Sequence, residues 1–342
     1  MQLKRAAKRN NFFSSFEAAE LMALPFLYFI EKMYISIEES AKILRQGGIV
    51  AIPTETVYGL AGNAFDETAV AKIFAVKERP FFDPLIAHIA EIEELENLAA
   101  EIPKNAKLLA EKFWPGPLTL VLLKKEKVPD LTTGGLPTVA VRMPQKQIAR
   151  DIIKLAGFPL AAPSANKFQH LSPTSAEHVL EQLSGKIDGI VNGGVCEIGV
   201  ESTVVGFEND IPVIYRPGAV TKEMIIESIG KTLDTKSYTI HPSPGMLEKH
   251  YSPNTMLCLE LPSEVPPNCG LLAFGKLPEN TTLFAKTLNL SATENLTEAA
   301  ANLYGMLHEL DSCKLNKIYA MLLPPVGLGV AINDRLTKAA DV

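Results

Sequence analysis

Short apolar runs alternate with amphipathic stretches from about residue 36 onward, and this alternation predicts most of the secondary structure. Ser36 and Glu39 form a capping box that starts a helix, and Gly47-Gly48 is expected to end it. The apolar run from Ile49 to Ile52 then predicts a buried strand that ends at Pro53. The fold is therefore expected to begin with a helix followed by a strand.

Further helices and strands are expected up to about residue 230. Asp66 is expected to cap a second helix, with Lys77 at or just past its end. Strand-like runs follow at 85–89, 118–123, 138–141, 160–162, 187–191, 203–207 and 213–215, and helical patterns at 105–113, 147–156, 176–183 and 222–229. Strands interleaved with helices in this way predict an α/β domain with a mixed, twisted sheet.

The chain is expected to contain four segments, of which residues 33–230 form the α/β domain. From 231 to 253 the periodicity disappears and prolines accumulate, as in a linker. Residues 254–342 predict a smaller α/β domain, with strands at 256–260, 271–274, 282–286 and 317–322 and a helix at 294–310. Residues 1–32 form an N-terminal extension, interpreted as a transit peptide, as a poorly ordered extension or as sequence upstream of a start at Met33.

Composition narrows the class of protein. The formal net charge is −6, which argues against a nucleic-acid-binding protein that relies on a diffuse positive field, although a local basic cleft stays open. The four cysteines lack zinc-ligand spacing, so they are interpreted as reduced packing residues of a cytoplasmic protein. The apolar stretch from Leu21 to Ile30 is too short to span a bilayer, and no membrane anchor is expected.

The segment Lys77-Glu78-Arg79-Pro80 is the main candidate for phosphate binding. Pro80 disfavours a helical conformation at Arg79, so the chain is expected to turn extended there and to point Lys77 and Arg79 the same way. An ammonium and a guanidinium suit a polyphosphate, whereas a solvated helix end is the plainer interpretation. The standard phosphate-binding loops are absent, and Gly327-Leu328-Gly329 lacks the third glycine of a dinucleotide loop.

Polar residues at strand ends are the second set of candidates. Ser164 and Asn166 follow the strand at 160–162, where α/β sheets place ligand-binding groups, although an ordinary turn is the alternative. Arg142 closes another strand and suits a substrate carboxylate, with a salt bridge at the rim as the alternative.

Two further residues lie close to buried strands. Thr54 emerges from the first strand, where a capped turn is the simpler interpretation. His88 lies inside an apolar strand, where a buried core histidine is the usual finding. No cluster of carboxylates with metal-site spacing stands out in the sequence.

Taken together, these segments resemble the threonylcarbamoyl-AMP synthase family, with a YrdC-type fold, in its longer two-domain form. The motifs that carry the resemblance are Pro-Thr-Glu-Thr-Val-Tyr-Gly-Leu at 53–60, Lys-x-Arg-Pro at 77–80, Pro-Leu-Ile-x-His at 84–88, Phe-Trp-Pro-Gly-Pro-Leu-Thr at 113–119, Val-Ala-Val-Arg-x-Pro at 139–144, Ala-Pro-Ser-Ala-Asn at 162–166, Ser-Pro-Thr at 172–174, Glu-Ser-Thr-Val-Val at 201–205, Arg-Pro-Gly at 216–218, Ser-Pro-Gly-Met at 243–246 and Lys-His-Tyr-Ser-Pro at 249–253.

The resemblance implies a fold, a reaction and its partners. The first domain is expected to form an open concave site, and the second to be Rossmann-like. The implied enzyme condenses L-threonine, bicarbonate or CO2, and ATP to threonylcarbamoyl-AMP and pyrophosphate, with Mg2+ bound through ATP rather than by dedicated protein ligands. Partner transferase proteins then place the threonylcarbamoyl group on tRNA, and a contact with tRNA or double-stranded RNA is expected.

The resemblance also implies roles for individual residues. Lys77 and Arg79 are expected to be the catalytic pair. The residues implied around ATP are Lys77, Arg79, Thr138, Ser164, Asn166, Ser172 and Arg216, with His250 or Tyr251 covering the nucleotide from the linker. The residues implied around threonine are Thr54, His88, Arg142, Ala162 and Ser202.

Some positions depart from the family pattern. Glu78 stands where glycine is usual and Asp83 where asparagine is usual, so these acids are expected either to weaken ATP binding or to face solvent. The stretch from Lys167 to His170 is also atypical and puts the local fit around Ser172 in question. Two other functions stay open, namely a protein of this fold that binds structured RNA and a carbamoyl-transfer enzyme.

Overall fold

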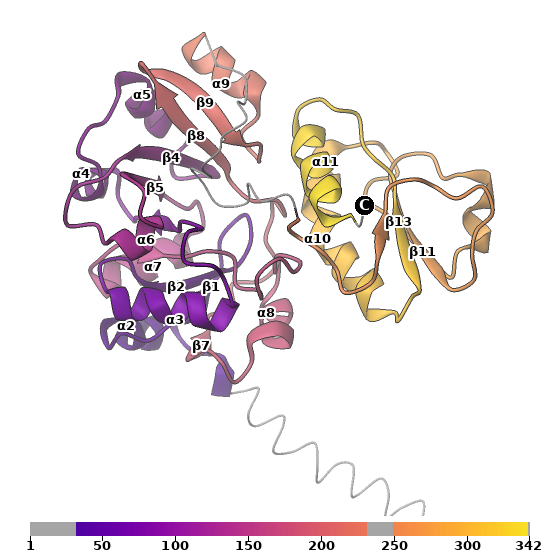
Figure 1. Ribbon diagram of the computed structural model, residues 1–342, viewed down its shortest axis with the longest axis horizontal. Helices are drawn as coiled ribbons and strands as arrows, with labels where there is room; N and C mark the ends of the chain where they lie inside the picture. Colours follow the sequence, from indigo (N-terminus) through magenta and orange to yellow (C-terminus); the bar gives the residue numbers. More distant parts are fainter. Residues whose placement is uncertain (1–31, 231–248, 341–342) are drawn as a thin grey trace, which may run out of the picture.

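The computed structural model describes residues 32–230 and 249–340, which form a large α/β domain and a smaller one (Figure 1). The large domain is built on a nine-stranded sheet in the order β7-β1-β2-β6-β3-β5-β4-β8-β9. Its strands are β1 Val50–Ile52, β2 Gly59–Asn63, β3 Ile86–His88, β4 Leu118–Leu123, β5 Thr138–Arg142, β6 Leu160–Ala161, β7 Gly189–Ile190, β8 Thr203–Glu208 and β9 Ile211–Arg216. Parallel pairs such as β3 with β5 and antiparallel pairs such as β4 with β5 occur together, which confirms the predicted mixed sheet.

The predicted helices of the large domain begin and end close to the expected positions, whereas the short helices at Leu95–Leu98 and Asp130–Thr133 were not predicted. The helices of this domain are α2 Ile37–Arg45, α3 Glu67–Lys77, α4 Leu95–Leu98, α5 Lys104–Phe113, α6 Asp130–Thr133, α7 Gln147–Ala156, α8 Ala176–Leu183 and α9 Lys222–Ile229, with a 3-10 turn at Ile92–Glu94. Ser36 and Asp66 cap α2 and α3 as expected, since their side chains accept hydrogen bonds from the backbone N–H groups of Glu39 and Thr68. These caps fix where each helix starts.

Alternation along β5 separates the core from the opposite face of the sheet. Val139 and Val141 pack into the main hydrophobic core, whereas Ala140 contacts a small cluster on the other face and Arg142 lies at the strand end. Because side chains alternate along a strand, this second face carries polar groups at the ends of the strands. His88 on β3 pairs directly with Arg142 on β5, so the parallel register places both residues at one edge.

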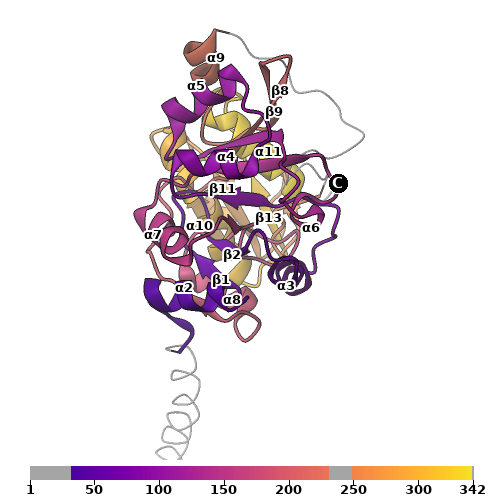
Figure 2. The same ribbon diagram turned by 90° about the vertical axis from the view of Figure 1, so that its left-hand side faces the viewer.

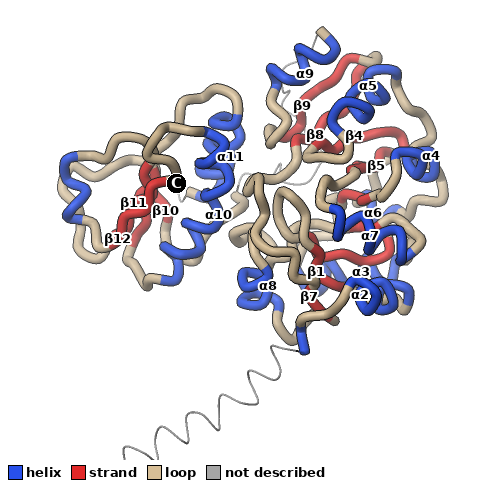
Figure 3. Tube along the Cα trace, turned by 180° about the vertical axis from the view of Figure 1, so that it is seen from behind, coloured by secondary structure: helices blue, strands red, loops and turns tan. Residues whose placement is uncertain are grey.

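The small domain contains a four-stranded parallel sheet in the order β10-β13-β11-β12. Its elements are β10 Leu257–Cys258, β11 Cys269–Ala273, β12 Lys286–Asn289, β13 Lys317–Ala320, α10 Leu296–Ser312, α11 Leu328–Ala339 and a 3-10 turn at Glu279–Leu283. Helices α10 and α11 lie between this sheet and the large domain (Figures 1 and 3), and Figure 2 shows the small domain directly behind the large one. A parallel sheet covered by helices agrees with the predicted Rossmann-like domain.

Three local expectations were incomplete or wrong. The strand expected at 282–286 begins only at Lys286, because Thr281 donates its hydroxyl to the carbonyl of Pro278 and a 3-10 turn forms there instead. Strand β2 was not predicted, since Gly59–Asn63 lacks β-branched residues and is held by pairing with β1 and β6. Helix α11 was also not predicted.

Parts of the expected domain division lie outside the described residues. Of the predicted extension at 1–32, only residue 32 is described. Most of the predicted linker at 231–253 also lies outside the described residues, because residues 231–248 are not among them. Within residues 32–230 and 249–340, no helix combines the length and the apolar composition needed to cross a membrane.

Candidate active site

A cavity opens at the strand edge that carries His88 and Arg142, and residues 250–251 form part of its wall. Its lining comes from loops after β1, β6 and β7, from β2, β3, β5 and β9, from the segment after α3 and from the segment that precedes the small domain. Most of the predicted site residues line it, namely Thr54, Arg79, His88, Arg142, Ala162, Ser164, Ser202, Arg216, His250 and Tyr251. The cavity is therefore the candidate active site.

Lys77 lies behind the cavity wall and fastens one of its loops. Its ammonium donates to the carbonyl oxygens of Ser164 and Asn166 at 2.5 and 2.6 Å. Burial, and then the nearby Arg79 charge, hold the pKa of Lys77 well below its usual value. Lys77 thus connects the end of α3 to the loop after β6.

Lys77 and Arg79 are both buried, whereas the side chain of Glu78 is 72% exposed. The predicted separation of these side chains is observed, but its cause differs from the predicted extended segment. Glu78 adopts a left-handed conformation with φ of 57° and ends helix α3. Glu78 approaches Lys186 at 3.9 Å, so this acid faces solvent and not the cavity.

Asp83 is the one unusual acid that enters the site. Its carboxylate lies 2.9 Å from Nη2 of Arg79, and both side chains are buried. Arg79 also donates to the carbonyl oxygens of Asp83 and Pro84. The alternative that Asp83 faces solvent is therefore wrong, because Asp83 neutralises part of the Arg79 charge.

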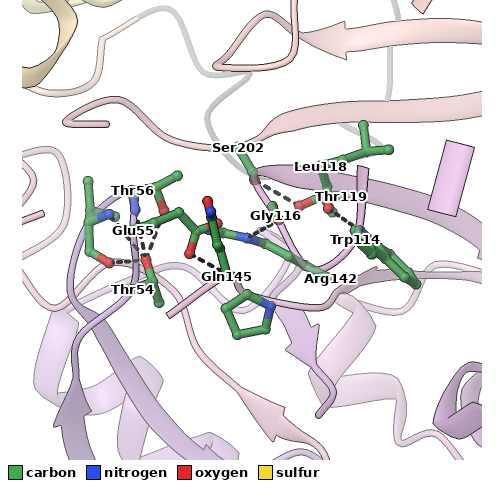
Figure 4. Close-up of polar contacts among 12 residues, drawn as sticks. Thr54, Glu55, Thr56, Trp114, Gly116, Leu118, Thr119, Arg142, Gln145 and Ser202 are labelled. Carbon is green, nitrogen blue, oxygen red and sulfur yellow. Dashed lines mark hydrogen bonds and ion pairs between the residues drawn. The ribbon is translucent and has the colours of Figure 1, made fainter. Parts of the chain in front are cut away.

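Arg142 forms a buried ion pair with Glu55, a residue that the sequence analysis did not single out (Figure 4). Nη2 of Arg142 lies 2.6 Å from Oε1 of Glu55, and Nε donates to the carbonyl of Gly116 at 3.3 Å. The other carboxylate oxygen of Glu55 accepts the backbone N–H of Gln145 at 3.0 Å. Because the pair is buried, Arg142 is not held by a salt bridge at the solvent-exposed rim. An acid inside the otherwise uncharged run 53–60 was the available signal for Glu55.

Thr54 caps a turn and also lines the cavity. Its hydroxyl donates to the carbonyl of Val57 at 2.6 Å and accepts the backbone N–H of Thr56 at 3.2 Å. Thr54 therefore forms the capped turn that the sequence favoured. Its side chain lines the cavity as well. Rigid turns of this kind hold side chains at fixed positions.

His88 is a buried histidine that faces the cavity. Its Nδ1 lies 3.1 Å from the carbonyl oxygen of Ile86. Burial, and then the Arg142 charge, lower the pKa of His88 to about 3, so its imidazole is neutral at neutral pH. Because the His88 ring is uncharged, the positive charge at this edge of the sheet comes from Arg142.

Ser202 and Arg216 form a further part of the cavity wall. Nη2 of Arg216 donates to the carbonyl and to the hydroxyl oxygen of Ser202 at 2.9 and 3.1 Å. The hydroxyl of Ser202 also lies 2.8 Å from that of Thr119, as Figure 4 shows. These contacts fix the orientation of the Ser202 side chain.

Asn166 and Ser172 support the cavity from outside its lining. The Asn166 amide donates to the carbonyl oxygens of Lys167 and His170, and so holds the atypical stretch at 167–170 in a turn. Ser172 donates to Glu201 at 2.6 Å. Thr138 lies elsewhere, at the opposite end of β5 from Arg142, in a separate cavity with Leu123 and Tyr215.

His250 and Tyr251 bring two unpaired polar atoms into the cavity. Both residues are buried, and their rings lie 4.0 Å apart between centroids. Within the described part of the chain, Nδ1 of His250 and the hydroxyl of Tyr251 have no hydrogen-bond partner. Buried polar atoms without partners are rare in folded proteins, so these two atoms are available to a molecule bound in the cavity.

Residues 32–230 and 249–340 contain no group of three or more histidine, cysteine, aspartate or glutamate residues able to hold a metal ion. Glu201 does line the cavity, but its oxygens accept hydrogen bonds from Ser172, Tyr304 and Arg335. The Glu201 oxygens are therefore already engaged by protein groups. Glu201, Tyr304 and Arg335 were not predicted as site residues.

A mixed sheet with cationic side chains at one edge, followed by a small parallel domain, is the architecture of a two-domain YrdC-type protein. The family model of the Sua5, YciO and YrdC proteins, described as "Telomere recombination", matches residues 42–218. A second model, described as "Threonylcarbamoyl-AMP synthase, C-terminal domain", matches residues 220–341. The chain belongs to the threonylcarbamoyl-AMP synthase family, in its long form with both domains.

Individual relatives agree with this assignment along nearly the whole chain. The threonylcarbamoyl-AMP synthase of Pyrococcus abyssi is 42% identical and the match covers 91% of this chain and 95% of that protein. The synthase of Bacillus subtilis is also 42% identical, with 89% and 92% covered. The crystal structure of P. abyssi Sua5 complexed with L-threonine matches with a TM-score of 0.82, at 42% identity, over 89% of this chain and 94% of that one. The resemblance predicted from the sequence motifs is confirmed.

Proposed function

We propose that this chain is an L-threonylcarbamoyladenylate synthase, which condenses L-threonine, bicarbonate or CO2, and ATP to threonylcarbamoyl-AMP and pyrophosphate. The observation that carries the proposal is that three buried arginines, Arg79, Arg142 and Arg216, line one cavity. The reaction needs an amino-acid carboxylate and a triphosphate side by side, and each anion requires its own cation.

The edge formed by β3 and β5 is the proposed threonine side. Arg142 binds the carboxylate as a bidentate donor, and Ser202 supplies a hydroxyl that Thr119 and Arg216 hold in place. Thr54, His88 and Ala162 complete the threonine pocket. Because His88 is neutral, it adds no positive charge that would repel the threonine amine.

The wall formed by the end of α3 and the loop after β6 is the proposed ATP side. Arg79 faces the phosphates, and Lys77 holds the loop that carries Ser164. Asn166, Ser172 and Arg216 are assigned to this side too, and His250 and Tyr251 cover the nucleotide with their unpaired polar atoms. Thr138 can reach the same ATP only if the nucleotide extends along the face of β5 past Ala140.

Catalysis in this proposal consists mainly of positioning and charge neutralisation. The neutral threonine amine captures CO2, and the resulting carbamate oxygen attacks the α-phosphorus while pyrophosphate leaves. A carboxylate fixed by Arg142 aims the amine at the phosphates, and Arg79 stabilises the charge that develops there. Mg2+ enters with ATP, bound by phosphate oxygens and water.

The reactivity of threonylcarbamoyl-AMP indicates which partner proteins the enzyme would need. A mixed anhydride of a carbamate and AMP is reactive, so we propose that a transferase protein takes the threonylcarbamoyl group directly and places it on tRNA in the cytoplasm. Contact between this chain and tRNA or double-stranded RNA belongs to the same proposal.

The function is tested by supplying purified protein with ATP, Mg2+, L-threonine and 13C-bicarbonate and analysing the products by mass spectrometry. The expected result is threonylcarbamoyl-AMP that carries one 13C atom, formed only when all three substrates are present. AMP or pyrophosphate formed at the same rate without threonine would contradict the proposal. A parallel reaction with carbamoyl phosphate in place of threonine and bicarbonate separates it from carbamoyl transfer.

A further inference from the structure

Glu201 is a cavity residue that the small domain holds in place. It lies immediately before Ser202, and its carboxylate accepts hydrogen bonds from the Tyr304 hydroxyl on α10 at 2.9 Å and from Nε of Arg335 on α11 at 2.7 Å. The large domain contributes the Ser172 hydroxyl at 2.6 Å. Two of these three groups therefore come from the other domain.

The ionisation state of Glu201 depends on this arrangement. Burial alone would raise the pKa of Glu201, but the charges of Arg335 and Arg216 and the Ser172 hydrogen bond lower it to about 2. The carboxylate is therefore ionised at neutral pH. An ionised carboxylate in a buried wall needs these partners to remain there.

Arg335 touches three parts of the site at once. Besides Glu201, its guanidinium donates to the carbonyl of Pro217, the residue after Arg216, at 2.9 Å. It also lies 5.0 Å from the ring centroid of Tyr251, a cation–π distance. Its side chain is 1% exposed. A single residue of α11 thus holds two wall segments and the tyrosine that closes the cavity.

We propose that Arg335, together with Tyr304, is a positioning residue of the synthase site, so that the small domain completes the nucleotide side of the cavity. The inference rests on the proposed function. Arg335 fixes Tyr251 by its cation–π contact and fixes Glu201 by its ion pair, and Tyr304 orients the same carboxylate. Without these contacts, Tyr251 loses its fixed place over the nucleotide, and ATP binds more weakly.

The test compares Arg335→Lys and Tyr304→Phe with the wild type in the full chain. Tyr319→Phe is the matched control, because Tyr319 is a buried tyrosine of the same domain that packs on Phe284, on the sheet face away from α10. The measured quantities are kcat, the KM for ATP, the KM for threonine and the thermal midpoint.

We expect both site variants to raise the KM for ATP about tenfold, as the loss of one hydrogen bond to a buried charge does, and to raise the KM for threonine by a smaller factor, since Glu201 adjoins Ser202. A purely structural role would lower kcat through loss of folded protein and leave the KM for ATP as it was; that pattern would overturn the inference. Tyr304→Phe removes a single hydroxyl and keeps the test valid if Arg335→Lys does not fold. If the wild type makes no threonylcarbamoyl-AMP, the proposed function itself fails.

Discussion

Arg142 and Glu55 form an ion pair of 2.6 Å inside the wall of the cavity, with side chains that are 5% and 3% exposed. Glu55 holds one edge of the guanidinium in place and compensates its charge in the absence of a ligand. A substrate carboxylate therefore meets an arginine that is already oriented. This is the kind of pre-organised cation that positions a reactant for catalysis.

Breaking this pair is expected to destabilise the fold strongly. Glu55→Ala leaves a buried, uncompensated guanidinium, so we expect it to lower the free energy of unfolding by about 3–5 kcal/mol. Arg142→Met should cost a similar amount, and the double variant less than the sum of the two. Urea unfolding measures all three.

The control for this prediction is Glu111→Ala. Glu111 pairs with Lys107 at 4.0 Å between side chains that are 53% and 72% exposed. An exposed pair of this kind is worth less than about 1 kcal/mol. If Glu55→Ala cost no more than Glu111→Ala, the buried pair would not have the structural role assigned to it.

Asp83 is expected to lower the affinity of the site for ATP. Its carboxylate lies 2.9 Å from Arg79 and competes with the phosphates for that guanidinium. Asp83→Asn keeps the size of the side chain and removes its charge, so the KM for ATP should fall roughly threefold to tenfold. Glu78→Gln is the control, because Glu78 faces solvent and its replacement should leave the KM unchanged. If the KM for ATP rose in Asp83→Asn, Asp83 would not be competing with the phosphates for Arg79.

His88 is expected to make the fold sensitive to acid. Its pKa is about 3 in the folded chain and near 6.5 in the unfolded chain, so the unfolded state binds more protons between these values. Stability that is fully present above pH 6.5 is therefore lost as the pH falls toward 3.

The variant His88→Gln should lose less stability over the same pH range. The wild-type free energy of unfolding should fall by up to about 1.4 kcal/mol per pH unit through this group, and the variant should lack that contribution. Urea unfolding at several pH values between 6.5 and 4 measures the difference. Parallel curves for the two proteins would show that His88 is not buried in its neutral form.

Local signals in the sequence predicted most of the fold. Ser36 and Asp66 identify helix starts because a cap depends on residues two or three positions away. Arg142 and Ser164 could be placed in the site because each follows an apolar strand. The exceptions are informative, since β2 has little intrinsic strand propensity and is held by its two neighbours.

The residues that the sequence did not reveal act through distant partners. Glu201 and Arg335 are 134 positions apart, and Glu55 and Arg142 are 87 positions apart. A local pattern can mark one member, as the lone acid at 53–60 does, but it cannot identify the partner, because such pairs form only when the sheet and the two domains assemble. Lys77 illustrates an intermediate case, in which its burial opposite to the exposed Glu78 agrees with the prediction, whereas the backbone is left-handed at Glu78 and the Lys77 ammonium contacts carbonyl oxygens behind the cavity wall.

Lys77 offers the most direct test of the account. Pyrophosphate release from ATP is measured with threonine and bicarbonate present and with each omitted, on the wild type, Lys77→Met and the control Lys72→Met. Lys72 is on the same helix but contacts the carbonyl of Gly47 away from the cavity. We predict release that depends on both threonine and bicarbonate in the wild type and in Lys72→Met, and a loss of about a hundredfold in Lys77→Met, because the loop that carries Ser164 loses its anchor. Equal release by Lys77→Met and the wild type would contradict the claim that the loop held by Lys77 is part of the active site.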